Sequence, residues 1–267
     1  MNKPAGKCIF CRNGNLSKEH IFADWLHEYL PRTRSFTDHR VNHGLDDPYG
    51  RKDVAAGKLA NNGDPLSRKL RVVCASCNNG WMSRLQILAK PILLPFVLGK
   101  WRALDANETR IIANWITMFT MVIEFADPAT AVVPVAQREL FAARDDDARR
   151  PPMGWRMWIG LQEGNESDFY HFGVASINPA ELLSWNWAMI TTFFIGRLTV
   201  QAVRIDRLYP QPIDEYPKIL NLVDLWPRPA VRPRAPGIVY FSMQSSLIRA
   251  FRNEIVGFLA PHNDPGA

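Results

Sequence analysis

Four cysteines, arranged as two Cys-x-x-Cys pairs, constrain the fold of this 267-residue chain more than any other feature. Cys8 and Cys11 form the first pair, Cys74 and Cys77 form the second, and 62 residues lie between them. In a cytoplasmic chain disulfides are disfavoured, whereas two such pairs supply the four thiolates of a tetrahedral Zn²⁺ site. A thioredoxin-like redox motif is the alternative, but it needs a single pair at a strand-to-helix junction. The spacing therefore predicts a structural zinc ion with a complete ligand set.

A zinc ion held by both pairs would bring two distant segments of the chain together. The runs Glu19–Phe22 and Leu70–Val73 are short and strand-like, so they can pair as a hairpin. An apolar helix is expected to begin at or just after Cys77 and to stop before Pro91. The N-terminal part of the chain is thus expected to form a β-β-α unit held by zinc.

In this arrangement the sequence resembles the HNH endonucleases, also called His-Me finger or ββα-metal nucleases, in the version with two zinc knuckles. The resemblance covers about residues 8–85: a Cys-x-x-Cys pair, an acidic residue followed by His and an aliphatic residue, and a strand-like run leading into Cys-x-x-Cys-Asn. It implies hydrolysis of DNA phosphodiester bonds with one divalent cation, Mg²⁺ or another metal, separate from the zinc. By position, it implies His20 as the general base and Glu19 and Asn78 as ligands of that cation. The usual setting of such nucleases is defence against phage or a mobile element.

The residue types at these positions suit that chemistry. An imidazole titrates near neutral pH and can therefore deprotonate a water molecule. Carboxylate and amide oxygens, as offered by Glu19 and Asn78, are ligands that hard cations prefer. Because Glu19 and His20 are adjacent, a regular strand would point them to opposite faces, so a shared site needs a strand end or an irregular turn.

Two positions depart from the family pattern. An Asn that orients the catalytic His usually lies about five residues before the third cysteine, where this chain has Lys69. Asn61, Asn62 or Asn79 can substitute for it. Ala23 stands where relatives often have Pro. A second hypothesis therefore stays open: a non-catalytic zinc-knuckle module that binds nucleic acid, with Glu19 and His20 as ordinary surface residues.

The basic character of the chain is concentrated near its N-terminus. Residues 1–100 contain 16 Lys and Arg against 8 Asp and Glu, whereas residues 101–267 contain 16 against 18. A basic domain attracts polyanions through phosphate contacts, so we expect DNA as the partner, with RNA not excluded. The simpler alternative is a solvated basic face. Residues 27–68 form an insertion that can close over a nucleic-acid backbone or be a solvated loop. Three of its histidines can add to a metal site: His27, His39 and His43.

The sequence of the remaining two thirds of the chain predicts helices followed by strands. Asp105 and Glu108 resemble a capping box before a helical apolar pattern that ends near Phe125, and a shorter amphipathic helix is expected at Val135–Ala143. Aromatic and β-branched runs indicate an antiparallel sheet. These runs are Trp155–Gln162, Phe169–Ile177 and Trp187–Ile205, the last broken near Gly196. A final helix is expected from Ser242, after the proline-rich segment Trp226–Pro236.

The fold class expected from these patterns is α+β. We expect two parts: an HNH-like zinc-knuckle module with a basic insertion at residues 1–100, and an α+β domain with an antiparallel sheet and apolar helices, of unassigned role, at residues 101–267. The longest run without a charged residue has 15 residues, from Leu182 to Gly196. This is shorter than the roughly 18–20 residues needed to cross a bilayer, so no membrane-spanning helix is expected.

Overall fold

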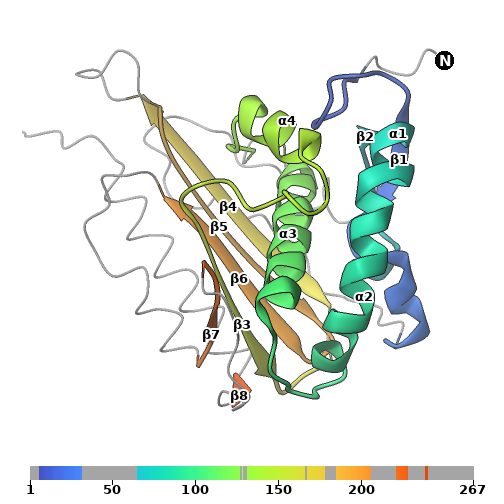
Figure 1. Cartoon of the computed structure of the whole chain (residues 1–267), viewed down its shortest axis with the longest axis vertical. Helices are drawn as coiled ribbons and strands as arrows, with labels where there is room; N and C mark the ends of the chain where they lie inside the picture. The colour runs from blue at the N-terminus through green and yellow to red at the C-terminus, as the bar shows by residue number, and fades with distance from the viewer. Residues whose placement is uncertain are drawn as a thin grey trace, which may run out of the picture.

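The computed structural model describes residues 6–31, 65–126, 128, 131–165, 167–177, 185–205, 221–227 and 238–239. Within these residues the fold is mixed α+β, with a two-stranded antiparallel sheet and a six-stranded sheet (Figure 1). All strand pairs in the larger sheet are antiparallel except the short parallel pairing of the last strand. The expected fold class is therefore confirmed at this level.

The two-stranded sheet is the hairpin predicted between the cysteine pairs. Strand β1 (Leu16–His20) pairs antiparallel with β2 (Lys69–Cys74). The register shifts between the pairs Ser17–Val73 and Glu19–Leu70, because β2 has one residue more than β1 in this interval. The first strand begins and ends earlier than predicted.

The helix that follows β2 is longer than predicted. It starts with a short turn of α-helix, α1 (Ala75–Cys77), passes through η3 (Asn78–Met82), where the non-helical Gly80 (φ −93°, ψ −114°) kinks the chain, and runs on as α2 (Ser83–Val97). The expectation that it stops before Pro91 is wrong, since Pro91 and Pro95 both lie inside α2. Pro91 is exposed, so water can solvate the backbone groups left unpaired there, while the buried face of the helix packs in the core.

Helix α3 (Ala106–Ile123) begins at the predicted capping box. The Asp105 side chain accepts a hydrogen bond from the Glu108 amide (2.8 Å), and the Glu108 carboxylate accepts one from the Asp105 amide (3.2 Å). A 3₁₀ turn, η4 (Glu124–Ala126), follows α3 directly. Helix α4 spans Val135–Ala143, as the sequence pattern predicts.

The larger sheet contains the predicted strands in the order β4–β5–β6–β3–β7, with β8 paired to β3. The predicted run near Gly196 divides into β5 and β6, which are joined by a tight turn. The strands are β3 (Trp155–Gln162), β4 (Asp168–Ile177), β5 (Trp185–Ile195), β6 (Leu198–Ile205), β7 (Val223–Trp226) and β8 (Ile238–Val239).

Helix α3 is the middle layer of the molecule. It contacts β6 and β7 of the large sheet on one side and α2 on the other (Figure 1). Every residue from Ile111 to Ile123 is buried, and the ring of Phe119 lies 4.3 Å from that of Phe193 on β5. One continuous cluster of buried apolar residues extends from the first cysteine pair to the sheet. The hairpin is therefore packed onto the same core as the rest of the chain.

Some predictions fall outside the described residues. These are the helix expected from Ser242, the segment after Pro227 and residues 32–64 of the insertion.

No helix among the described residues combines the length and apolar character that a bilayer crossing requires.

Candidate metal centre and basic hairpin

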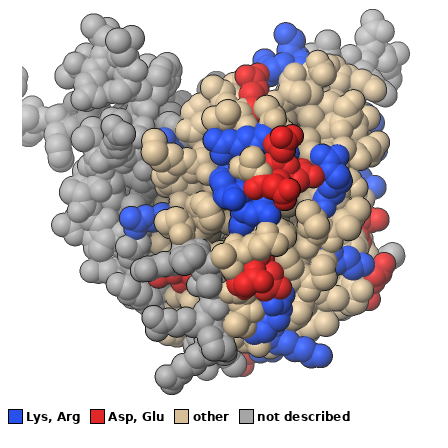
Figure 2. Space-filling view, in the orientation of Figure 1, with Lys and Arg blue, Asp and Glu red and all other residues tan. Residues whose placement is uncertain are grey.

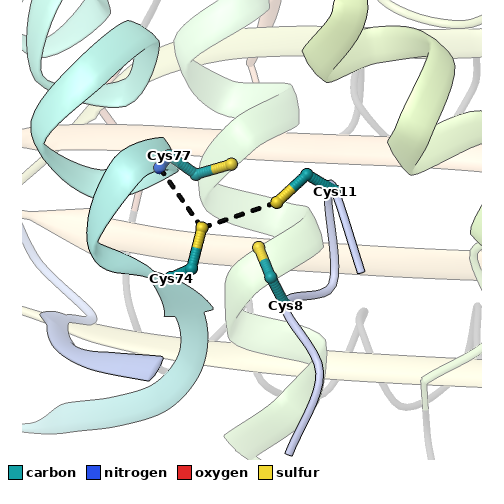
Figure 3. Close-up of side chains that lie close together, drawn as sticks. All are labelled: Cys8, Cys11, Cys74 and Cys77. Carbon is teal, nitrogen blue, oxygen red and sulfur yellow. Dashed lines mark hydrogen bonds between the residues drawn. The ribbon is translucent and has the colours of Figure 1, made fainter. Parts of the chain in front are cut away.

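The four cysteines lie together as the spacing predicts. Cys8 and Cys11 come from the loop before β1, Cys74 ends β2, and Cys77 ends α1. Their thiols are turned toward one another (Figure 3), and all four sulfur atoms lie within 4.8 Å of one another. The Cys11 and Cys74 sulfurs are 3.5 Å apart. Four thiolates bound tetrahedrally at about 2.3 Å would be about 3.8 Å apart, so the cluster can hold a metal ion such as zinc.

Backbone hydrogen bonds preorganise this cluster. The Cys77 amide donates to the Cys74 sulfur (3.4 Å), and the Ile9 amide donates to the Val72 carbonyl (2.9 Å), which joins the two knuckles. Arg12 has a left-handed backbone conformation (φ 62°), which turns the chain directly after Cys11.

Ionisation of these buried cysteines requires a compensating positive charge. Burial, together with the neighbouring thiols, raises the pKa of Cys77, and burial also raises that of Cys11. Burial opposes ionisation of Cys74 as well, but hydrogen bonds from the Cys77 amide and the other thiols lower its pKa overall. Four thiolates cannot share this space without a positive charge, and a metal ion supplies that charge.

Trp81 connects the cysteine cluster to the rest of the molecule. Its ring contacts Phe10 of the first knuckle edge-on (5.0 Å between centroids) and Phe141 of α4 (5.7 Å). The Arg149 guanidinium lies over the same ring at 4.6 Å, while its Nη1 donates to Asp146 (2.6 Å). The knuckle is thus held against α4 by aromatic and cation–π contacts.

The hairpin has a basic outer face and a more protected inner face. Side chains alternate between the faces of a strand, and directly paired residues share a face. His20 pairs with Lys69, and the exposed residues Lys18 and Arg71 follow the same alternation. Glu19 pairs with Leu70 on the other face. Strand geometry therefore separates Glu19 from His20.

His20 lies at the end of β1, where it has two polar contacts. Its Nδ1 is 3.3 Å from the Leu66 carbonyl of the 3₁₀ turn η2 (Pro65–Ser67), and its Nε2 is 3.4 Å from Asp24 Oδ1. A hydrogen bond from Nδ1–H to Leu66 leaves the lone pair on Nε2, which is the tautomer needed for a base or a metal ligand.

Glu19 and Asn78 are brought together on the inner side of the hairpin. Burial raises the pKa of Glu19 to about 7, and a hydrogen bond from the Asn78 side chain opposes this rise. Asn78 Nδ2 also donates to Ser17 Oγ (3.1 Å). Asn78 is the first residue of η3, two residues before the kink at Gly80. Two of the three residues expected in a catalytic site are thus adjacent.

His20 lies in a different cluster. Among the described residues, two groups of three or more His, Cys, Asp or Glu side chains can hold a metal: the four cysteines, and His20 with Asp24 and His27. Asp24 and His27 belong to a 3₁₀ helix, η1 (Asp24–Glu28), and Asp24 was not singled out by the sequence analysis. The spacing His-x₃-Asp-x₂-His is the signal that could have identified the group.

The structure explains in part how Lys69 and Ala23, which depart from the HNH pattern, are accommodated. Lys69 is the cross-strand partner of His20, and the Leu66 carbonyl contacts the His20 ring. Ala23 has φ −55° and ψ 132°, a conformation that proline would also adopt, so the turn keeps this geometry without proline. Asn79 is exposed, and Asn61 and Asn62 lie outside the described residues.

Charges of both signs share the face shown in Figure 2, where Lys and Arg side chains alternate with Asp and Glu. Ion pairs among the described residues include Arg84 with Asp146 (2.7 Å) and Arg102 with Glu108 (2.7 Å). The exposed basic residues of the hairpin form a separate group.

Comparison of the chain with protein-family models, curated proteins and solved structures gives no match in any of the three.

Proposed function

We propose that this protein is a metal-dependent, HNH-like endonuclease that hydrolyses phosphodiester bonds in DNA. Its cysteine cluster would hold a structural Zn²⁺ ion, His20 would be the general base, and Glu19 with Asn78 would hold a divalent cation such as Mg²⁺. The observation that carries the proposal is the position of His20: its ring contacts a backbone carbonyl through Nδ1 and shares the hairpin face with exposed basic residues.

The basic outer face would bind the nucleic-acid backbone. Lys18, Lys69 and Arg71 are exposed on the hairpin beside His20. Phosphate contacts of this kind supply affinity without reading sequence, and they would position a phosphodiester near the imidazole.

His20 would accept a proton from the attacking water. Its Nδ1 contact with Leu66 fixes the ring and leaves the lone pair on Nε2, which can accept the proton. Asp24, 3.4 Å from Nε2, would stabilise the imidazolium that forms. A cation held by Glu19 and Asn78 would neutralise charge on the phosphate and on the leaving oxygen. Because the strand separates Glu19 from His20, the phosphodiester would have to reach both side chains around the end of β1.

Glu19 and Asn78 have a chemistry that fits a cation. Glu19 offers a carboxylate beside Asn78, and burial raises the pKa of Glu19 to about 7. The Asn78 amide turns its nitrogen toward Ser17 and Glu19, so it would rotate to present its oxygen to a cation. A bound cation would favour the ionised carboxylate and so reverse that rise. Glu19 is therefore expected to ionise when the metal binds.

The proposal is tested by comparing His20→Ala with His171→Ala. His171 is an imidazole on β4 that contacts Thr191 (2.7 Å) and has no part in the proposed site. Loss of a general base typically lowers the rate by about 10²–10⁴-fold. We expect that loss in Mg²⁺- or Mn²⁺-dependent cleavage of plasmid DNA by His20→Ala only, with zinc content and DNA affinity retained. Cleavage by His20→Ala at the wild-type rate would refute the role of His20.

A non-catalytic nucleic-acid-binding module is the second candidate function. The observation in its favour is Lys69, a cation where related nucleases have an Asn, directly across from His20. Wild-type protein that binds DNA or RNA but cleaves neither, with any common divalent metal, would support this candidate and contradict the nuclease.

A further inference from the structure

We propose that His20, Asp24 and His27 form a binding site for a first-row transition-metal ion such as Zn²⁺ or Co²⁺, separate from the cysteine cluster. Two imidazole nitrogens and one carboxylate oxygen meet there, and all three ligand atoms lie within 4.8 Å of one another. Two histidines with one carboxylate are a donor set that such metals use in proteins.

Local backbone geometry builds this group. In a 3₁₀ helix, side chains three residues apart lie directly above one another, and Asp24 and His27 have this spacing in η1. His20 ends β1 four residues earlier, so the turn through Ala23 brings its ring back toward Asp24. The strand end and the short helix together supply the three ligands.

Two of the three distances between ligand atoms are close to those of a metal site, and the third is within 4.8 Å. Asp24 Oδ1 is 3.4 Å from His20 Nε2 and 4.0 Å from His27 Nε2. Ligands bound at about 2.0–2.1 Å in a tetrahedral site are about 3.3 Å apart. The Asp24 side chain is 80% exposed, so its rotation can close the remaining difference.

The surroundings of the imidazoles favour coordination through Nε2. The His20 Nδ1 contacts the Leu66 carbonyl, an outer contact typical of metal-bound histidines. The His27 Nδ1 is buried without a hydrogen-bond partner among the described residues, which leaves Nε2 as the nitrogen that can meet a ligand. Both imidazoles are about four-fifths buried, at 19% and 22% exposure, whereas Asp24 faces solvent. A bound ion would thus keep positions open to water.

Metal binding at this group does not depend on nuclease activity. If His20 is also the general base, coordination would occupy the Nε2 lone pair that base catalysis needs. The experiment therefore measures binding alone, so a failure of this proposal and a failure of the proposed function are distinguishable.

The test is a titration of full-length protein, with its cysteine cluster already filled by zinc, with Co²⁺. Calorimetry and visible absorption should detect one additional Co²⁺ per chain, without the sulfur-to-cobalt charge-transfer band that thiolate ligands give. Asp24→Asn and His27→Ala should each weaken this binding roughly tenfold or more. Glu28→Gln is the matched control, an exposed carboxylate in the same turn that lies outside the group, and it should bind as wild type does.

Three results would overturn the proposal. The first is the absence of an additional Co²⁺ ion. The second is wild-type affinity in Asp24→Asn, whose exposed side chain makes this variant the one expected to fold normally even if His27→Ala does not. The third is displacement of Co²⁺ by a moderate excess of Mg²⁺, because Mg²⁺ prefers oxygen ligands and competes poorly for imidazole nitrogen.

Discussion

Glu124 is a carboxyl group buried in the core at the end of α3. Its side chain has no exposed surface and accepts hydrogen bonds from Arg138 Nη2 (2.6 Å) and from the Val132 amide (3.0 Å). Burial nevertheless raises its pKa to about 6, although Arg138 opposes the rise. The ion pair fixes the loop between α3 and α4, at the expense of removing a carboxylate from water.

This carboxyl group should make stability depend on pH. Its folded-state pKa lies above the usual value of 4.5, so its contribution is fully present below that value and is lost as pH rises through about 6. We expect the free energy of unfolding to fall by up to about 2 kcal/mol over this interval. Urea unfolding at several pH values should show a steeper slope in wild type than in Glu124→Gln, which keeps the contribution of Glu19. Equal slopes in both proteins would contradict the assignment.

Gly196 is required by the turn between β5 and β6. It has φ 55°, and a Cβ atom there would lie 2.7 Å from the Val97 carbonyl oxygen. The neighbouring Arg197 amide donates to the same carbonyl (2.9 Å), so the turn is held tightly against the end of α2.

Replacing Gly196 by Ala should therefore destabilise the protein. The strained backbone and the close contact predict a loss of about 1–3 kcal/mol, measured by thermal or urea unfolding. Gly14→Ala is the control, since a Cβ atom at Gly14 meets nothing within 4 Å. An equally small effect of both substitutions would show that the turn relaxes.

The capping box of α3 stabilises the helix that forms the middle layer. Asp105→Ala removes the side-chain acceptor of the Glu108 amide and should cost about 1 kcal/mol in unfolding free energy. Asp105→Asn keeps a side-chain oxygen and should recover most of that loss. If the two variants were equally unstable, the negative charge of Asp105, rather than its hydrogen bond, would be responsible.

A metal-filled cysteine cluster should contribute to the stability of the whole molecule. Its residues belong to the same apolar cluster as α3 and the sheet, so unfolding of the knuckle exposes part of a shared core. We expect about one Zn²⁺ per chain, and a large loss of thermal stability in Cys74→Ser or after chelation. Ser76→Ala, in the same turn but exposed, is the control. Cys74→Ser protein with unchanged zinc content and stability would contradict a structural metal.

Binding of DNA at the basic hairpin should depend strongly on salt. Each phosphate contact releases counterions, so removing one contact lowers the slope of log affinity against log salt by about 1. We expect this change for Lys69→Ala and not for Lys100→Ala, an exposed lysine beyond the end of α2. An affinity that does not vary with salt would argue against nucleic acid as the partner.

Local patterns in the sequence were sufficient for much of this fold. The cysteine spacing predicted the four-sulfur cluster, the run rich in aromatic and β-branched residues predicted β3 over Trp155–Gln162, and the Asp105 box predicted the start of α3. These features depend on side-chain period and on hydrogen bonds between near neighbours, which a single sequence records directly.

Only the tertiary structure decided how the candidate site residues group. Helix α2 passes through Pro91 because packing of its buried face offsets the lost hydrogen bond, a balance that local propensity does not contain. Glu19 and His20 are adjacent in sequence, yet the strand turns Glu19 toward Asn78 and His20 toward Asp24 and His27. The physical reason is that successive side chains of a strand point to opposite faces, so the register of the hairpin and the turn after it determine which side chains meet.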